Sequence, residues 1–276
     1  MDLQAAIEQL RAQAGLQLDL TQLMLAFALL MARILPVILF TPFLGGDVVP
    51  SEVKLGLGLL IGMVIYPALA DQVRNVPVSA LIFIALMLKE LFIGLSMAFV
   101  VGIVFDAAQV AGGLIDIMSG TNQAQLMVPQ IAQNVSLFAN LKVQLVTVVF
   151  LMVGGHHVVI AAFADSLQFV SLDAFPRFSR GLWPFFDTII RVFGDLMRIS
   201  LALASPVLLA TFLTDLALGL VNRVAPQVQV FFVAMQIKPA VTVLVMFAAL
   251  HVILDRVMVE YGVLFRWLRT VLELLS

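Results

Sequence analysis

Six apolar segments, each near the length that crosses a bilayer as a helix, constrain this 276-residue chain more than any other feature. They span residues 21–44, 55–70, 78–105, 137–164, 188–221 and 230–254. A hydrocarbon core of ~30 Å requires about 20 apolar residues in a helix. Hydrophobic residues make up 62% and charged residues 12% of the chain, against ~45–50% and ~25% in soluble domains. The sequence therefore predicts an all-α, polytopic helical membrane protein without a separate soluble domain.

Amphipathic patterns at both ends predict two further helices. Residues 1–20 begin with apolar side chains at helical spacing, and residues 255–276 carry a longer apolar face. That face consists of Val257, Tyr261, Leu264, Leu268 and Leu275. Between them, prolines lie within or at the ends of the apolar segments, among them Pro36, Pro206 and Pro239. A proline inside a helix removes a backbone hydrogen bond and bends it, so we expect kinked helices.

Charged residues interrupt the apolar segments and exclude a simple lipid-facing bundle. They are Arg33, Lys89, Glu90, Lys142, Arg191, Asp195, Arg198, Asp215 and Lys238. At roughly 3 kcal/mol each, nine lipid-exposed charges would cost on the order of 27 kcal/mol, against a usual stability of ~5–15 kcal/mol. Most must therefore face protein or water. Helical spacing places Arg191, Asp195 and Arg198 on one face, whereas the adjacent Lys89 and Glu90 point about 100° apart and are not expected to pair.

The segment 106–136 is rich in glycine and polar residues, yet it contains too many apolar residues for a solvated loop. Irregular backbone between apolar helices is tolerated where protein buries it or a water-filled cavity meets it. We therefore expect an irregular segment that lines a pore, with Met118 and Met127 as a deformable seal. Elsewhere, small residues at four-residue intervals predict close helix packing; they are Gly58, Gly62, Gly94, Ala98 and Gly102.

Catalysis and cofactor binding find no support in the residues. The chain has no cysteine, and a net charge of −2 does not suit a nucleic-acid partner. His156 and His157 are adjacent, so on a helix they diverge and cannot chelate one metal ion. Gly45-Gly46-Asp47 lacks the partner motif of an intramembrane aspartyl protease. We therefore expect neither an enzyme nor a cofactor. A secondary transporter with a mid-membrane site at broken helices remains the alternative to a channel component.

Three ordered stretches resemble the FliR/SctT family, the single-copy subunit of the type III protein export gate. The first stretch holds Ala32-Arg33-Ile-Leu-Pro, Thr41-Pro42-Phe43, Val49-Pro50 through Lys54-Leu-Gly-Leu-Gly, and Tyr66-Pro67. The second stretch holds Lys89-Glu90-Leu-Phe-Ile-Gly94, Ala111-Gly112-Gly113-Leu-Ile115-Asp116 and Gly120. The third stretch holds Asn222-Arg223-Val-Ala-Pro226-Gln227, Phe231 and Lys238. Together they cover residues 32–240. Ala98, Val128, Gln229 and Gln236 depart from the residues usual in the family and leave the flagellar or injectisome branch open, although the Phe231-to-Lys238 run is closer to injectisome members.

The resemblance implies a non-enzymatic subunit of a ring-like helical gate in the bacterial inner membrane, through which unfolded protein substrates leave the cytoplasm. It implies FliP/SctR-type and FliQ/SctS-type subunits and the FlhB/SctU-type switch protein as partners, besides membrane lipid. It further implies a kinked helical hairpin over 188–254, after an N-terminal helical part over 21–164. The hairpin turn would hold Asn222, Arg223, Pro226, Gln227 and Phe231.

Two groups of residues acquire roles from the same resemblance. The channel plug would fall within 106–136, on Gly112, Gly113, Ile115, Asp116, Met118, Gly120, Asn122 and Met127. Intramembrane charges would become subunit contacts, namely Arg33, Lys89, Glu90, Arg191, Asp195, Asp215 and Lys238. The orientation of the termini stays open. With six spans, the two chain ends and the second and fourth loops together hold seven Lys and Arg, and the other three loops hold two. This excess favours both termini in the cytoplasm. The family instead suggests a cytoplasmic turn near 222–229 and a C-terminus on the other side.

Overall fold

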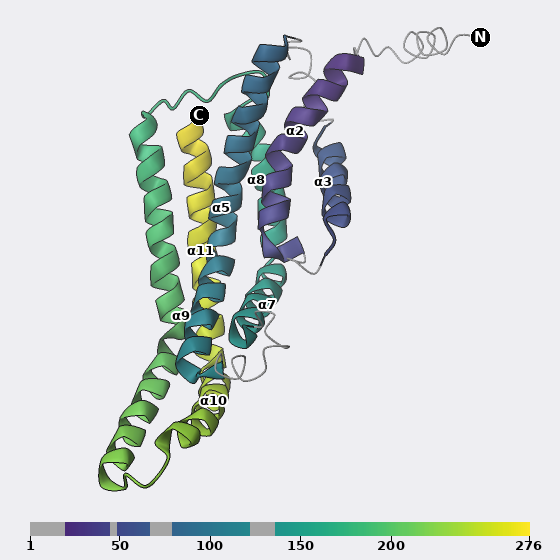
Figure 1. Ribbon diagram of the computed structural model, residues 1–276. Helices are drawn as coiled ribbons and strands as arrows, with labels where there is room; N and C mark the ends of the chain where they lie inside the picture. Colours follow the sequence, from purple (N-terminus) through teal and green to yellow (C-terminus); the bar gives the residue numbers. More distant parts are fainter. Residues whose placement is uncertain (1–19, 45–48, 67–78, 122–135) are drawn as a thin grey trace, which may run out of the picture. The chain divides into compact units, whose positions relative to one another are not determined.

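The computed structural model describes residues 20–44, 49–66, 79–121 and 136–276, and all regular structure within them is helical. In chain order the elements are α2 (Leu20–Phe40), the short 3-10 helix η1 (Pro42–Leu44), α3 (Ser51–Ile65), α5 (Ala80–Ser119), α7 (Leu137–Met152), α8 (Gly155–Phe169), α9 (Leu182–Val224), α10 (Val230–Ala248) and α11 (Leu250–Leu275) (Figure 1). The all-helical membrane fold expected from the sequence is confirmed. The expected N-terminal helix over 1–20 lies almost wholly outside the described residues.

Fewer helices are long enough to cross a membrane than the six apolar segments suggest. Among the described residues four qualify by length and composition: Gln22–Phe40, Ala80–Ser119, Leu182–Val224 and Val230–Ala248. The helices α7 and α8 together add a fifth if their bent pair counts as one span. The segment at 55–70 falls short because α3 contains only 15 residues.

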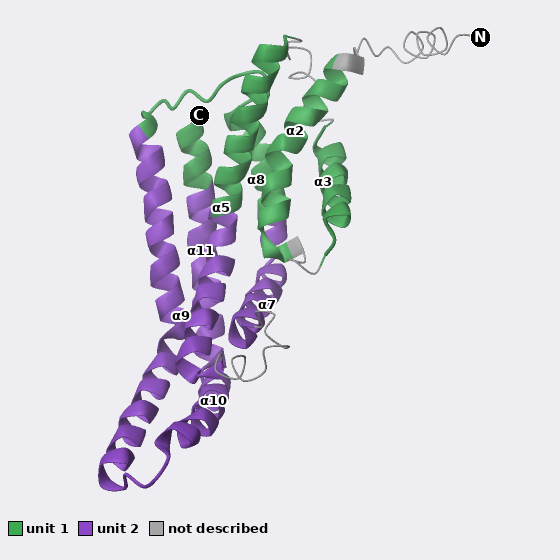
Figure 2. Ribbon diagram, in the orientation of Figure 1, with its two compact units in different colours: residues 1–99, 159–182, 269–276 green, residues 100–158, 183–268 purple. Residues whose placement is uncertain are grey.

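The chain divides into two compact units (Figure 2). Unit 1 comprises residues 1–99, 159–182 and 269–276. In it α3 packs on α2 through two glycines, since a side chain on Gly58 would meet Leu35 and one on Gly62 would meet Met31. A side chain on Gly94 of α5 would strike the backbone carbonyl of Arg33. The missing side chains thus allow both helices to approach α2 closely.

Unit 2 comprises residues 100–158 and 183–268, and an aromatic cluster forms part of its core. The rings of Phe105 and Phe150 lie 5.3 Å apart between centroids, and that of Tyr261 lies 5.2 Å from Phe150. The Tyr261 hydroxyl donates to the carbonyl of Val146 over 2.7 Å, and burial raises the pKa of Tyr261. The C-terminal helix has the apolar face expected from its sequence, because all five residues of that face are buried.

The expectation of an irregular backbone from Asp106 onward is wrong for residues 106–119. These residues continue α5 as one helix of 40 residues, which ends before Gly120 with its φ of 76°. A glycine inside a helix costs up to about 1 kcal/mol relative to alanine. Packing offsets that cost here, because Gly112 lies directly against the backbone of Ala139 at the start of α7. Residues 122–135 lie outside the described part of the chain.

The expected hairpin contains a tighter turn than the sequence suggested. The helix α9 ends at Val224 and α10 begins at Val230. Asn222 and Arg223 therefore belong to the last turn of α9 and Phe231 to the first turn of α10, which leaves Pro226 and Gln227 in the turn. Pro206 and Pro239 both lie inside their helices, and α9 changes direction partway along its length in Figure 1.

Candidate functional site

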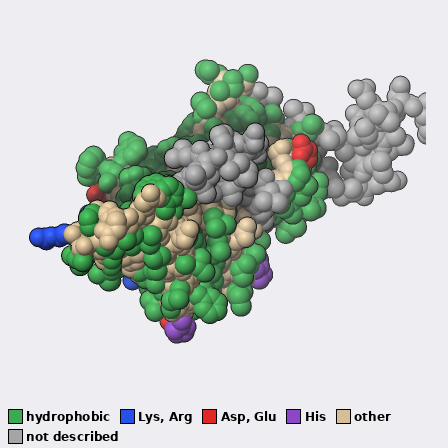
Figure 3. Space-filling model, turned by 60° about the horizontal axis from the view of Figure 1, so that its bottom comes forward, with side chains coloured by type: hydrophobic (Ala, Val, Ile, Leu, Met, Phe, Trp, Pro, Cys, Tyr) green, Lys and Arg blue, Asp and Glu red, His purple; other side chains and the backbone are tan. Residues whose placement is uncertain are grey.

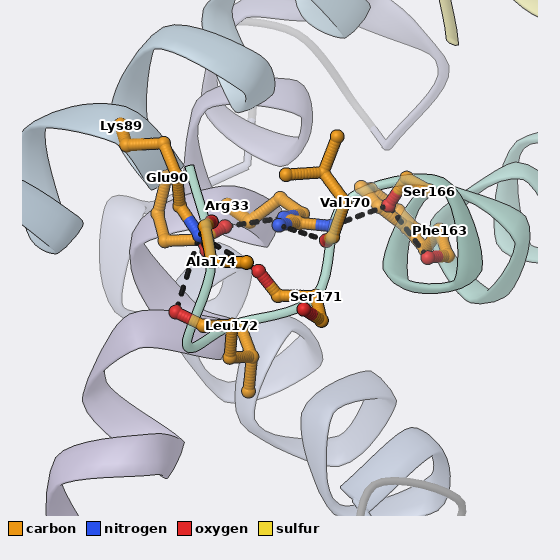
Figure 4. A network of polar contacts seen from close by, with 9 residues as sticks. All are labelled: Arg33, Lys89, Glu90, Phe163, Ser166, Val170, Ser171, Leu172 and Ala174. Carbon is orange, nitrogen blue, oxygen red and sulfur yellow. Dashed lines mark hydrogen bonds and ion pairs between the residues drawn. The ribbon is translucent and has the colours of Figure 1, made fainter. Parts of the chain in front are cut away.

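A buried charge cluster occupies unit 1 where α2 and α5 meet the chain that follows α8 (Figure 4). Its members are Arg33, Lys89 and Glu90, of which Arg33 and Glu90 are fully inaccessible to solvent. Arg33 donates from Nε to the Glu90 carboxylate. The Lys89 Nζ atom lies 2.6 Å from the other oxygen of the same carboxylate. One acidic group is thus shared by two cations inside the protein.

The remaining donors of this cluster bond to the Ser166 hydroxyl in α8 and to backbone carbonyls beyond the end of that helix. Arg33 donates to Ser166 Oγ over 3.1 Å and to the carbonyl of Val170 over 2.9 Å. Lys89 donates to the carbonyls of Ser171, Leu172 and Ala174 at distances of 2.9–3.1 Å. These carbonyls lie in the irregular chain after α8, and buried backbone carbonyls require hydrogen-bond partners. The two cations therefore fix the exit of α8 against α2 and α5.

Two expectations about these residues are corrected. Lys89 and Glu90 do pair, because the long lysine side chain bends toward a carboxylate that already faces Arg33. All three side chains find partners within the chain, where Glu90 offsets one of the two positive charges and backbone carbonyls accept hydrogen bonds from both cations, so the shelter expected from other subunits lies here within the chain. Sequence reasoning found the charges but missed Ser166 and the carbonyls of 170–174, since a backbone acceptor leaves no signature in the sequence.

A second buried carboxylate, that of Asp116, joins the end of α5 to the start of α7 in unit 2. It accepts hydrogen bonds from Ser136 Oγ at 2.6 Å and from the backbone N–H groups of Phe138 and Ala139 at 3.2 Å. The Thr121 hydroxyl donates to it over 3.0 Å. Asp116 therefore caps the N-terminus of α7 from another helix, where a negative charge is favourable.

Some of the residues assigned to the plug lie at the end of α5, and others lie outside the described residues. Gly112, Gly113, Ile115, Asp116 and Met118 all belong to α5, and Gly120 follows its end. Asn122 and Met127 lie outside the described residues. Ile115 and Asp116 are fully buried, which indicates packing at these two positions. The plug role itself stays a prediction.

The hairpin of α9 and α10 forms a contrasting, largely uncovered surface. In their most apolar stretches only 28% of the α9 residues and 6% of the α10 residues are buried within the chain. Large apolar side chains are exposed along both helices, including Phe186, Phe193, Leu209, Phe212, Leu213, Leu216, Leu220, Phe231, Phe232, Leu244 and Phe247. Figure 3 shows a face of the molecule on which hydrophobic side chains predominate and charged ones are few.

Ion pairs run along the same hairpin, mostly at its surface. Arg191 pairs with Asp187 at 2.7 Å. Arg191 lies four residues from both Asp187 and Asp195, so its spacing allowed either pair. Lys238 of α10 pairs with Asp215 of α9 at 2.5 Å and links the two helices. Of the expected subunit contacts, Arg191, Asp215 and Lys238 therefore lie where another subunit can reach them.

Asp195 pairs with Arg198, as their shared helix face predicted, and also has a partner on α11 that the sequence did not indicate. Arg198 Nε donates to it over 3.1 Å, and Trp267 Nε1 of α11 donates to it over 2.9 Å. Arg198 also approaches Glu260 of α11, which is buried and lies 2.6 Å from Arg256. These contacts hold α9 against α11 inside unit 2. They are invisible in the sequence because the partners lie more than sixty positions apart.

Two features of the described residues bear on metal binding and on the chemistry of one cavity. No group of three or more His, Cys, Asp or Glu side chains within them is placed to hold a metal ion. A cavity of about 350 Å³ in unit 1 is lined only by apolar residues of α2 and α5, from Ala32 to Phe40 and from Ile84 to Leu91. Such a lining provides no acid, base or nucleophile.

Comparison with known proteins finds similar sequences over most of the chain. The family model described as bacterial export proteins, family 1, matches residues 24–262. The chain is 27% identical to the flagellar biosynthetic protein FliR of Bacillus subtilis over 91% of this chain and 96% of that protein. It is 29% identical to the Yop proteins translocation protein T of Yersinia pestis over 81% and 85%. It is 26% identical to the surface presentation of antigens protein SpaR of Salmonella typhimurium over 84% and 85%.

Proposed function

The chain belongs to the bacterial export proteins, family 1, the FliR/SctT family, and we propose that its α9–α10 hairpin joins the neighbouring subunits of the export gate. As a member it is a non-enzymatic inner-membrane component of the type III export apparatus, flagellar or injectisome. The resemblance seen in the sequence is thereby confirmed. Relatives of both branches show similar identities, so they do not separate the two.

The observation that carries the proposal is the length of exposed apolar surface on α9. With 43 residues, this helix extends about 65 Å, whereas the hydrocarbon core measures ~30 Å. Exposed apolar side chains occur from Trp183 near its start to Val224 at its end. Lipid tails can cover no more than about half of that length. Protein is required for the rest, and other gate subunits are the natural source.

Charged residues on the hairpin support the same conclusion. Asp187, Arg191 and Asp195 lie in one half of α9 and Asp215 in the other. A charge at the centre of a bilayer costs roughly 3 kcal/mol on the insertion scale. Surfaces that alternate apolar side chains with charges suit subunit contacts or a water-filled passage better than lipid. Our proposed neighbours are FliP/SctR-type and FliQ/SctS-type subunits, with the FlhB/SctU-type switch protein, around a passage for unfolded protein substrates.

We further propose that the channel is sealed near the end of α5. Met118 is partly exposed there, five residues beyond the open position of Gly113. Deleting Gly112 to Asn122 would also remove the buried anchor Asp116, so a substitution gives a cleaner test. Met118→Ala should raise the ion conductance of assembled gates in a bilayer, with Met258→Ala on α11 as the control. Unchanged conductance would remove the seal from this position.

Two substitutions on α9 test the hairpin proposal. Phe212 is exposed and Leu203 is buried within unit 2. Phe212→Ala should leave the thermal stability of the free chain unchanged but reduce co-purification of the gate subunits at least about tenfold, since a large apolar side chain contributes about 1.5–3 kcal/mol when buried. Leu203→Ala should destabilise the free chain itself. If Phe212→Ala retains its partners in full, the hairpin is not the joining surface.

The secondary transporter stays the weaker alternative, since its motivation was broken helices with charges nearby. The family match points to export, and the buried charges at α2 and α5 are fully engaged within the chain. A transporter would also bind a small solute as a single chain in detergent. Calorimetric binding by the free chain would revive that alternative.

A further inference from the structure

The second half of α5, residues 100–119, has one uncovered strip, although most residues of that half are buried. Residues 100–105 are all buried, and the next turns then expose one side of the helix. Leu114 and Met118 are partly exposed beside this side, which itself consists of Asp106, Gln109, Val110, Gly113 and Ile117. Their spacing of three or four residues places them on one face over about 17 Å. We call these five residues the α5 docking face.

Asp106 has no ion-pair or hydrogen-bond partner within the part of the chain that the structure describes. Its carboxylate lies back over the preceding turn, where Oδ2 is 3.4 Å from the site that a side chain on Gly102 would occupy. The other carboxylates of α5 behave differently, since Glu90 and Asp116 are buried and multiply bonded. Asp106 is thus a charged group held at the surface of an apolar helix without a counter-charge.

Lipid and water each suit only part of the α5 docking face. Lipid would cover Val110 and Ile117 but would leave the charge of Asp106 in hydrocarbon, at roughly 3 kcal/mol on the insertion scale. Water would solvate Asp106 and Gln109 but would leave both β-branched side chains exposed. A second helix accommodates all of them, provided that it carries a cation opposite Asp106.

The arrangement of the face matches a helix–helix seam. Asp106, Val110, Gly113 and Ile117 are spaced four, three and four residues apart, which is the spacing of the core positions where two helices interlock. Nothing lies within 4 Å of the place that a side chain on Gly113 would fill. A glycine there permits close approach of a neighbouring backbone, and a single polar residue in such a seam sets its register.

We propose that the α5 docking face receives one helix of another gate subunit, which places a lysine or arginine against Asp106. The inference rests on the proposed function, since it requires neighbouring subunits. It differs from the hairpin proposal in its surface and in its chemistry, because an ion pair rather than a large apolar area selects the partner.

The experiment uses the full chain assembled with the native export apparatus and purified in mild detergent. Asp106→Lys should reduce co-purification of the gate subunits more than about tenfold, because it places like charges together in the seam. Asp255→Lys on α11 is the matched control, since Asp255 is an exposed carboxylate whose only described ion pair is with His251, and it should retain the wild-type yield. A photoreactive phenylalanine analogue at Gln109 should crosslink to the partner helix, and exchanging its basic residue for Asp should restore the Asp106→Lys yield.

A second variant covers the case in which Asp106→Lys fails to fold. Gly113→Leu adds bulk to an open position, so the free chain should keep its thermal stability while co-purification falls. Wild-type yield for both variants, or a crosslink from Gln109 to lipid alone, would overturn the inference. If these variants are neutral while Phe212→Ala still loses its partners, only the α5 docking face is excluded. If Phe212→Ala is neutral as well, the proposed function fails.

Discussion

The helices α5 and α9 are nearly equal in length and apolar content, yet they occupy opposite environments. They contain 40 and 43 residues, and their most apolar stretches have mean hydropathies of 2.2 and 1.9. In those stretches 72% of the α5 residues are buried within the chain but only 28% of the α9 residues. Hydropathy alone therefore does not distinguish a helix that forms the core of the subunit from one that offers its surface to neighbours.

Glycine positions explain part of the difference. Gly94 and Gly112 of α5 lie directly against the backbones of Arg33 and Ala139, so neighbouring helices approach where a side chain would obstruct them. Gly194 and Gly219 of α9 have nothing within 4 Å of the corresponding place. The close approaches that glycine allows are used within the chain at Gly94 and Gly112 of α5, and they are left free at Gly194 and Gly219 of α9.

The charged side chains of α5 and α9 also differ in their burial. The α5 carboxylates Glu90 and Asp116 are buried and bonded to groups of this chain. On α9, Asp187 and Asp215 pair at the surface with Arg191 and Lys238. Buried charges cannot be left without a partner, whereas exposed pairs contribute little. The buried charges Glu90 and Asp116 of α5 thus stabilise the subunit, and the exposed pairs of Asp187 and Asp215 on α9 are available for recognition.

Glu90→Ala should produce the largest effect on the α5 side of the comparison. The substitution leaves Arg33 and Lys89 buried together without an acid, and breaking a buried pair costs about 3–5 kcal/mol. That is a large part of the ~5–15 kcal/mol by which proteins are stable. We expect aggregation of the free chain in mild detergent, measured by size-exclusion chromatography. Asp187→Ala on α9 is the control and should elute as wild type; equal behaviour of the two variants would contradict the distinction.

Adjacent glycines of α5 provide a finer test. Gly112→Ala pushes a methyl group into the backbone of Ala139, and overpacking costs about 1–3 kcal/mol. Gly113→Ala meets open space and should be neutral or stabilise the helix by up to about 1 kcal/mol. Thermal unfolding of the free chain measures both. A similar loss of stability for the two variants would show that α5 resists any added side chain, irrespective of its neighbour.

The sequence predicted the helices of this fold better than their partners. Long apolar stretches with helical spacing were sufficient to locate α2, α5, α9 and α10. The glycine-rich stretch from Asp106 was misread because its helical state depends on the contact of Gly112 with α7, which no local pattern reveals. Tertiary packing overrode local propensity there.

The charge cluster was predictable only in its members. Interrupted apolar segments made Arg33, Lys89 and Glu90 stand out, since charges in such segments require shelter. Their partners did not stand out, because Arg33 meets Glu90 across 57 positions and the carbonyl of Val170 across 137. For the same reason the sequence placed the shelter in other subunits, where the structure finds it within the chain. Backbone acceptors and long-range pairs are determined by the fold and not by residue type.

Arg191→Ala should produce the smallest effect and sharpens the comparison from the α9 side. The Arg191 and Asp187 side chains are 65% and 43% exposed, so solvent screens their attraction. The melting temperature of the free chain should not change measurably. Co-purification of the gate subunits is the decisive measurement, because a surface pair that is idle in the free chain gains importance only where another subunit excludes water from it. A reduced yield with unchanged stability would assign Arg191 to a subunit contact, whereas unchanged values of both would restrict the joining surface to the apolar side chains of the hairpin.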